Sequence, residues 1–249
     1  MYNFEDLNIN KPLLNALHDL GYIHPTPIQE KSFSVIMSGQ DMVGIAQTGT
    51  GKTFAYLLPI LRMHKFSEKK YPKVLILVPT RELVTQVVSE IEKLAKYMSL
   101  KYAGIYGGTN INPQKKIVSA GLDILVSTPG RAVDLAMLGI LRLKLVHHFV
   151  IDEVDEMTDQ GFKAQLTTIL DLLPPKRQNI FYSATFSENV SALTQTFPTN
   201  SQIIELAPHG TPLEKIKQFA YKSPNYFTKV NLLEHLLLKK KKFTKTLVC

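Results

Sequence analysis

The sequence contains a single cysteine, Cys249, and no tryptophan. One cysteine cannot form an internal disulfide, which favours an intracellular protein over a secreted, disulfide-stabilised one. No run of about 18 apolar residues is present, so no membrane span is expected. The opening stretch MYNFEDLNIN is too acidic and polar for a secretory signal. Together these absences predict a cytoplasmic protein, which we expect to be a monomer.

Most of the chain also lacks an excess of charge of either sign. Residues 1–207 carry 20 basic and 19 acidic side chains, whereas residues 208–249 carry 9 and 2, so the net charge of +8 arises almost wholly in the last part. The basic isoelectric point is therefore weak evidence that the larger part binds nucleic acid. The run Lys239–Lys242 is either a solvated loop or a phosphate contact.

Short apolar segments alternate with amphipathic ones along the chain. The apolar segments predict strands at Asp41–Ala46, Val74–Val78, Tyr102–Tyr106, Asp123–Ser127, His147–Ile151, Asn179–Ser183 and Ile203–Leu206. Several of them are apolar at consecutive positions, which favours strands covered on both faces. Residues 81–98 and 162–173 place apolar residues every three or four positions, which predicts helices; the first presents Leu83, Val87, Ile91, Leu94 and Met98 on one face. This alternation predicts an α/β fold, a three-layer sandwich around a parallel sheet.

The stretch GIAQTGTGKTFAY, Gly44–Tyr56, joins a predicted strand to a predicted helix. The free N–H groups and dipole at a helix start attract anions, and glycine lets the backbone curl around a phosphate. The predicted nucleotide-binding residues are Thr48, Gly49, Thr50, Gly51, Lys52 and Thr53. Lys52 would reach the β and γ phosphates, and the Thr53 hydroxyl would ligate Mg²⁺. The pattern departs from the usual loop in one position, since Ala46 replaces its first glycine.

The stretch FVIDEVDEM, Phe149–Met157, places carboxylates just after another predicted strand. Ligands collect at the carboxyl ends of strands in open α/β sheets. Asp152 would hold Mg²⁺ directly or through water, and Glu153 would orient and deprotonate the attacking water, with Lys52 neutralising phosphoryl charge. The alternative is a helix cap, which Asp155 or Asp159 can provide. His147 and His148 point to opposite faces of a strand, so no metal site is expected there.

These motifs, taken together, resemble the first half of a DEAD-box ATP-dependent RNA helicase. The resemblance covers nearly all of residues 1–207 and rests on short segments that occur in the family's order: GYIHPTPIQ (21–29), AQTGTGKT (46–53), PTREL (79–83), GG (107–108), TPGR (128–131), DEVD (152–155) and SAT (183–185). It implies that residues 1–207 form a RecA-like P-loop NTPase domain that uses ATP and Mg²⁺.

The resemblance also implies which residues recognise adenine. The Gln29 amide can donate and accept at once, which fits the edge of the base. Either Tyr22 or the upstream Phe4 would cover the face of the ring.

The segments after three strands resemble the family's RNA-backbone motifs. The implied RNA-binding residues are Pro79, Thr80, Arg81, Gly108, Thr128, Pro129, Gly130 and Arg131. Hydroxyls and amides would bind phosphates, while the two arginines would add charge or brace the loops. Contacts of this kind reach the backbone of RNA and carry little sequence preference. The alternative is that these are ordinary turns and surface charges.

Two further expectations concern Asp155 and the signature itself. The hydroxyls of Ser183 and Thr185 would bond Asp155, either to couple hydrolysis to strand separation, as the resemblance implies, or simply to tie two strand ends together. In the DEVD segment, Val154 replaces the alanine that the family usually has there, while Asp152 and Glu153 are retained. Hydrolysis is therefore expected to survive, with altered coupling.

Residues 208–249 resemble the linker and the truncated beginning of a second RecA-like domain, ending in the strand-like TLVC. The family's second domain carries arginines that complete the ATP site, and such groups are worth about 10³–10⁵ in rate. We therefore expect this chain alone to bind nucleotide and RNA weakly and to separate duplexes little. The alternatives are a non-enzymatic RNA-binding or regulatory module and a DNA-acting translocase.

Overall fold

The computed structural model describes residues 3–65, 70–159, 161–195, 201–206, 219–238 and 246. These residues belong to two compact units, Met1–His209 and Gly210–Cys249. The described helix of the second unit is α10 (Tyr226–Leu237), which begins where the Asn225 side chain accepts a hydrogen bond from the Thr228 amide at 2.9 Å. The lysine run and most of the TLVC segment lie outside the described residues.

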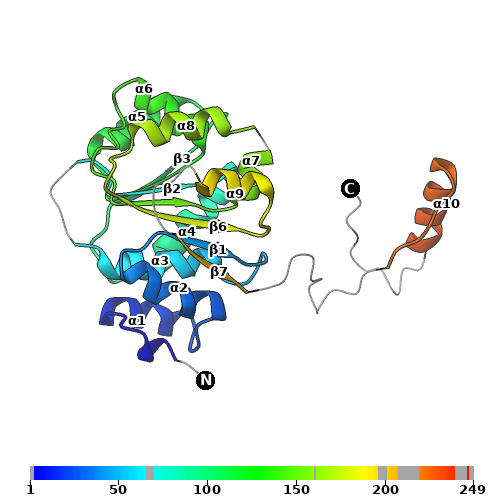
Figure 1. Ribbon diagram of the computed structural model, residues 1–249, viewed down its shortest axis with the longest axis horizontal. Coiled ribbons are helices and arrows are strands. Elements are labelled where there is room, and N and C mark those ends of the chain that lie inside the picture. The colour runs from blue at the N-terminus through cyan, green and yellow to red at the C-terminus, as the bar shows by residue number, and fades with distance from the viewer. Residues whose placement is uncertain are drawn as a thin grey trace. The chain divides into compact units, whose positions relative to one another are not determined.

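The first unit is built on a seven-stranded sheet in the order β3-β4-β2-β5-β6-β1-β7, in which every neighbouring pair is parallel (Figure 1). The strands are β1 (Met42–Ile45), β2 (Val74–Leu77), β3 (Tyr102–Ile105), β4 (Ile124–Ser127), β5 (His148–Ile151), β6 (Gln178–Ser183) and β7 (Gln202–Glu205). Each predicted strand is present and differs by at most one residue at either end. The prediction of a parallel α/β sandwich is confirmed.

Helices cover both faces of this sheet (Figure 1). A short 3-10 turn, η1 (Phe4–Asp6), opens the chain. The helices are α1 (Lys11–Asp19), α2 (Pro27–Met37), α3 (Lys52–Met63), α4 (Arg81–Leu94), α5 (Ile111–Ala120), α6 (Pro129–Met137), α7 (Val154–Asp159), α8 (Lys163–Leu172) and α9 (Glu188–Gln195). Among the described residues, no helix combines the length and apolar character needed to cross a membrane.

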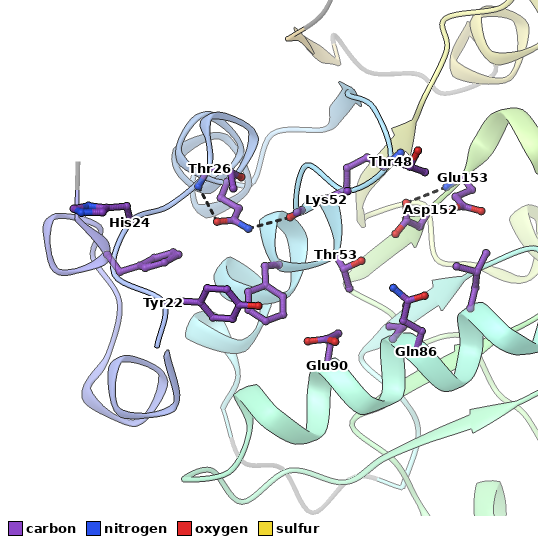
Figure 2. A pocket seen from close by; sticks show the side chains of 17 residues that line it. Tyr22, His24, Thr26, Thr48, Lys52, Thr53, Gln86, Glu90, Asp152 and Glu153 are labelled. Atoms are coloured by element: carbon purple, nitrogen blue, oxygen red, sulfur yellow. Dashed lines mark hydrogen bonds between the residues drawn. The ribbon is translucent and has the colours of Figure 1, made fainter. Parts of the chain in front are cut away.

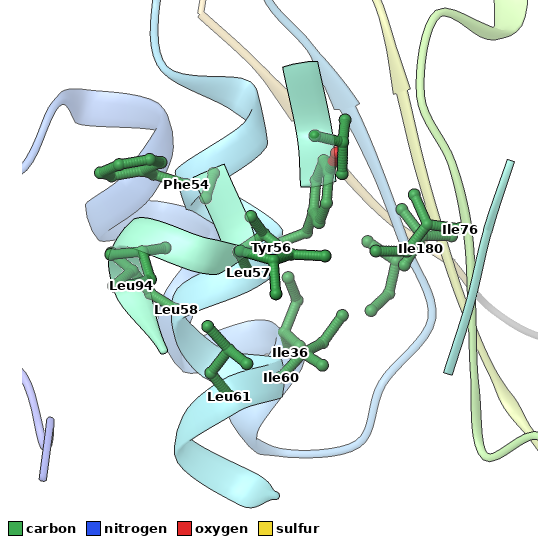
Figure 3. Packing of buried hydrophobic residues seen from close by; sticks show 14 of the residues in the cluster. Ile36, Phe54, Tyr56, Leu57, Leu58, Ile60, Leu61, Ile76, Leu94 and Ile180 are labelled. Atoms are coloured by element: carbon green, nitrogen blue, oxygen red, sulfur yellow. The ribbon is translucent and has the colours of Figure 1, made fainter. Parts of the chain in front are cut away.

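Two apolar cores lie on opposite faces of the sheet. Val74 and Ile76 of β2 pack with helices α1 to α4, whereas the alternating Leu75 and Leu77 pack with the helices of the other face. This alternation explains the run of consecutive apolar residues, because both faces of the strand are covered. Figure 3 shows the first core, where α3 lies against the sheet.

Helix α4 is shorter than its periodicity predicts. It begins at Arg81 because the Thr80 hydroxyl accepts a hydrogen bond from the Leu83 amide at 3.3 Å, and it ends at Leu94 rather than at Met98. The chain leaves the helix at Ala95, whose ψ of 8° departs from helical values. Val84, Val87, Ile91 and Leu94 form its buried face.

A buried polar network fixes the amino ends of the central strands. Asp41 accepts hydrogen bonds from the Asn179 amide at 2.8 Å and from the Asn179 side chain at 2.7 Å. Beside it, the Gln178 side chain lies 2.9 Å from His148 Nδ1 and donates to the Ile36 carbonyl at 3.0 Å. These bonds hold β6 in register with β1 at the edge opposite the phosphate loop.

Candidate nucleotide site and nucleic-acid rim

The loop between β1 and α3 is shaped by two glycines in the left-handed region. Gly49 has φ of 81° and Gly51 has φ of 89°, values that strain any other residue. A Cβ on Gly51 would also lie 2.4 Å from Gln29 Nε2. The hydroxyl of Thr50 donates to the Gln47 carbonyl at 2.7 Å, and Thr50 is not among the residues that line the cavity described below. Its part is to close the turn of the loop.

Lys52 begins α3 and points into the interior of the site (Figure 2). It is 7% exposed, and among the described residues its Nζ has no hydrogen-bond partner. A buried ammonium group without a partner is costly, since it loses hydration without gaining a hydrogen bond. The position therefore suits an anion.

Asp152 and Glu153 follow β5 and reach the same edge of the sheet. Asp152 accepts a hydrogen bond from the Glu153 amide at 3.0 Å, and Glu153 has φ of 58°, in the left-handed region. Burial raises the pKa of Asp152, with Lys52 acting in the opposite direction. Burial, and then the neighbouring carboxylates of Glu156 and Asp152, raise the pKa of Glu153 to about 7. Such a pKa suits a proton acceptor that works near neutral pH.

The amide of Gln29 links the amino-terminal segment to the loop. Its Oε1 accepts from the Thr26 amide at 2.9 Å, and its Nε2 donates to the Gly51 carbonyl at 3.2 Å (Figure 2). One N–H and one lone pair of the amide remain for a ligand. Tyr22 is 50% exposed and stands edge-on to Phe54 at 5.5 Å between ring centroids, whereas Phe4 is only 3% exposed. Of the two aromatic residues predicted to cover a base, Tyr22 presents the larger surface.

A cavity of about 500 Å³ joins these parts. From the predicted set it is lined by Phe4, Tyr22, Gln29, Thr48, Gly49, Gly51, Lys52, Thr53, Asp152 and Glu153. Residues that the sequence analysis missed also line it: His24, Thr26, Phe54, Leu83, Gln86, Val87 and Glu90. The α4 residues among them recur every three or four positions, so they occupy one helix face. That spacing is the available signal, but in the sequence it only places Leu83 and Val87 on one apolar helix face with Ile91 and Leu94; in the structure Leu83 is only partly buried.

Asp155, at the start of α7, binds the turn that follows β6 through its carboxylate. Its Oδ2 accepts from the amides of Ala184 at 3.2 Å and Thr185 at 3.0 Å, and from the Thr185 hydroxyl at 3.0 Å. Ser183 differs from expectation, because its hydroxyl donates to the Thr185 carbonyl at 2.7 Å. Ser183 ends β6 and is fully buried, so its hydroxyl is used within its own turn.

The predicted RNA-binding segments meet at the carboxyl ends of β2, β3 and β4. The Gly107 amide donates to the Thr128 hydroxyl at 3.3 Å, and the Arg81 guanidinium lies over the Tyr106 ring at 4.9 Å. Thr80, Gly108, Thr128 and Gly130 are at least partly exposed on this rim.

Three of the predicted RNA-binding residues are buried: Pro79, Pro129 and Arg131. Arg131 is only 6% exposed and donates to the Thr109 carbonyl at 2.9 Å. Arg131 therefore braces the loop that contains Gly108, which was one of its two predicted roles.

The loop after β1 is of the phosphate-binding type. In the same parallel sheet, β5 brings two adjacent carboxylates to the same edge. This combination defines a RecA-like P-loop nucleotide-binding domain. The DEAD/DEAH box helicase family matches residues 26–193. The chain therefore belongs to this family.

Individual relatives agree with that assignment. The chain is 39% identical over 227 residues to the ATP-dependent RNA helicase RhlB of Pseudomonas putida, covering 88% of this chain and 57% of the relative. It is 42% identical to the probable ATP-dependent RNA helicase DDX46 of Danio rerio, covering 84% and 21%. The crystal structure of a DEAD box protein from Methanococcus jannaschii superposes with a TM-score of 0.77 at 36% identity, covering 82% and 55%. The chain thus spans about half the length of RhlB and a smaller part of DDX46.

Proposed function

We propose that this chain carries the ATP-binding site and part of the RNA-binding surface of an ATP-dependent RNA helicase. The observation that carries the proposal is the buried Lys52 ammonium group, which has no partner among the described residues and lines the same cavity as Asp152 and Glu153. A triphosphate supplies the anion that this ammonium group needs. The relatives named above, which are called ATP-dependent RNA helicases, support ATP as the nucleotide.

The residues of the site fit magnesium as well as phosphate. Within the described ranges no group of three or more His, Cys, Asp or Glu side chains could hold a metal by itself. Mg²⁺ is commonly held by one or two carboxylates together with substrate phosphates, through oxygen ligands. The Asp152 carboxylate and the Thr53 hydroxyl are oxygen donors that line the cavity. When bound, Mg²⁺ would neutralise charge on the phosphates.

In the proposed reaction each residue of the chain has a distinct task. Lys52 and the amides of the loop hold the β and γ phosphates, and Asp152 and Thr53 hold the metal. Glu153 accepts a proton from the attacking water, for which a pKa of about 7 is suitable. Gln29 binds the edge of adenine, and Tyr22 covers its face.

Turnover would need groups beyond those of this cavity. No arginine is among the described residues that line it. Arginines that stabilise the transferring phosphoryl group contribute about 10³–10⁵ in rate in related phosphoryl-transfer enzymes. We therefore propose that the chain by itself binds ATP but hydrolyses it slowly, and that RNA stimulates it little.

Nucleotide binding is tested by titrating the chain with ADP and Mg²⁺ in a calorimeter. Lys52→Ala removes the charged partner of the phosphates and is expected to weaken binding by about 2 kcal/mol, or roughly 30-fold. The matched control is Lys116→Ala, an exposed lysine on α5. Equal affinities for the native chain and Lys52→Ala, or no binding by the native chain, would overturn the proposed site.

RNA binding is tested at Arg81, which we propose contacts a backbone phosphate. Arg142 provides a matched control, because it is also exposed and also lies over a tyrosine ring, that of Tyr71 at 5.3 Å. Arg81→Ala should weaken binding of a fluorescent single-stranded RNA and reduce the slope of log affinity against log salt by about 1, while Arg142→Ala should change neither. Equal effects of the two substitutions would place the RNA elsewhere, and preferential binding of DNA of the same sequence would favour a DNA-acting protein.

A further inference from the structure

Tyr56 lies directly beneath the proposed metal site. It follows Thr53 by three residues on α3, so the two side chains share one face of the helix. Its side chain is 0% exposed and lies within the core shown in Figure 3. Its ring packs against that of Tyr182 of β6 at 5.6 Å between centroids. Strand β6 lies between β1, which leads into the phosphate loop, and β5, which leads into Asp152. Tyr56 therefore fills the space below both motifs.

The Tyr56 hydroxyl is buried and, in the part of the chain that the structure describes, makes no hydrogen bond. The side chains of Asp152 and Thr53 lie close enough to act on it. A tyrosine hydroxyl is protonated near neutral pH, so toward a carboxylate it can only donate a hydrogen bond.

A hydroxyl at this position carries a cost that packing does not explain. Phenylalanine would fill the same space without leaving a buried polar group unpaired. The approach of the tyrosine pair to the sheet is also tight, since a Cβ on Gly44 would lie 2.6 Å from Tyr182 Cε1. The two residues beside the unpaired hydroxyl are the two proposed metal ligands.

We infer that Tyr56 is a positioning residue for the metal site: when Mg²⁺ and nucleotide bind, its hydroxyl donates a hydrogen bond to the Asp152 carboxylate and holds it, beside Thr53, in the orientation that the metal requires. This inference rests on the proposed function. Groups that orient a metal-binding side chain in this way are typically worth 10–100-fold in metal affinity. Tyr56 should therefore affect the magnesium-dependent part of nucleotide binding alone.

The test uses Tyr56→Phe, with Tyr182→Phe as the matched control. The Tyr182 hydroxyl is equally buried and makes no hydrogen bond among the described residues, but the hydroxyl beside it is that of Ser32, which is not a proposed metal ligand. For each protein, ADP affinity is measured by calorimetry in Mg²⁺ and again in EDTA, and the ratio of the two dissociation constants is compared. Thermal unfolding in EDTA reports on the fold.

Tyr56→Phe is expected to reduce the Mg²⁺-to-EDTA affinity ratio by about 10-fold, to leave ADP affinity in EDTA within about twofold, and to leave the melting temperature unchanged or higher. Tyr182→Phe should keep the native ratio. In an Asp152→Ala background, Tyr56→Phe should have no further effect on the ratio, because the side chain through which it acts is gone.

The outcomes separate this inference from the function on which it rests. If the native chain binds no ADP in Mg²⁺, the proposed function fails, and the role of Tyr56 fails with it. If the native chain binds ADP with a clear magnesium effect and Tyr56→Phe retains the same ratio, only the role of Tyr56 is overturned. A ratio that falls equally in Tyr182→Phe, or that Tyr56→Phe lowers further in the Asp152→Ala background, also overturns it.

Discussion

The left-handed backbone of Glu153 predicts an unusual response to substitution. Its φ of 58° is the one positive value at a non-glycine position among the described residues. A residue with a Cβ pays about 1–2 kcal/mol in this conformation, and glycine pays about 0.5–1 kcal/mol through its freer unfolded chain. Glu153→Gly should therefore be more stable than Glu153→Ala by about 1 kcal/mol. Both substitutions remove the carboxylate, so its raised pKa cancels from the comparison.

The matched control is Glu92, an exposed carboxylate on α4. In an ordinary helix, alanine is more stable than glycine by about 1 kcal/mol, so the order of the two variants should reverse there. The assay is thermal unfolding in EDTA without nucleotide, where 1 kcal/mol corresponds to about 2–4 °C for a domain of this size. If alanine is the more stable replacement at Glu153 too, the backbone strain inferred at this position is absent.

Three further predictions concern contacts around the site. Asp155→Asn weakens three hydrogen bonds from the Ala184–Thr185 turn. It should lower the free energy of unfolding by about 2 kcal/mol and speed hydrogen exchange of the amides in that turn; unchanged exchange would show that Asp155 does not hold the turn. Gly51→Ala should lower the melting temperature more than Gly49→Ala, because only Gly51 would also displace Gln29; equal effects would mean that backbone conformation alone matters. Gly44→Ala drives a methyl group against the Tyr182 ring and should cost about 1–3 kcal/mol in urea unfolding; an unchanged midpoint would contradict the close packing.

Elements with strong local signals could be predicted from the sequence, and the contacts between distant segments could not. The inner strands were located to within a residue because both of their faces are buried, whereas the edge strands β3 and β7 are more exposed. The phosphate loop was located because glycine and lysine occupy a strand-to-helix turn. In contrast, the cavity face of α4 has the same periodicity as a core face. Nothing in the local sequence distinguishes Leu83 at the edge of a cavity from Val84 in the core.

Other features of the site depend on geometry that the sequence does not encode locally. The burial of Arg131 depends on a loop from another strand, which supplies the Thr109 carbonyl. The φ of Glu153 depends on how β5 meets α7, and the hydroxyl of Ser183 finds its acceptor within its own turn. Of these features, the burial of Arg131 depends on a contact between distant segments, whereas the other two are set by the backbone of the turns in which they lie.

The order of the strands has a consequence for how the domain is assembled. Strand β1, which leads into the phosphate loop, is paired on one side with β6 and on the other with β7, so Met42 lies opposite both Ile180 and Gln202. Contacts between such distant residues form late, because a long stretch of chain must first be closed. During synthesis, the pairing of β1 can therefore become complete only after Gln202–Glu205 has emerged from the ribosome. A nascent chain stopped earlier would leave β1 as a bare edge, open to pairing with other chains.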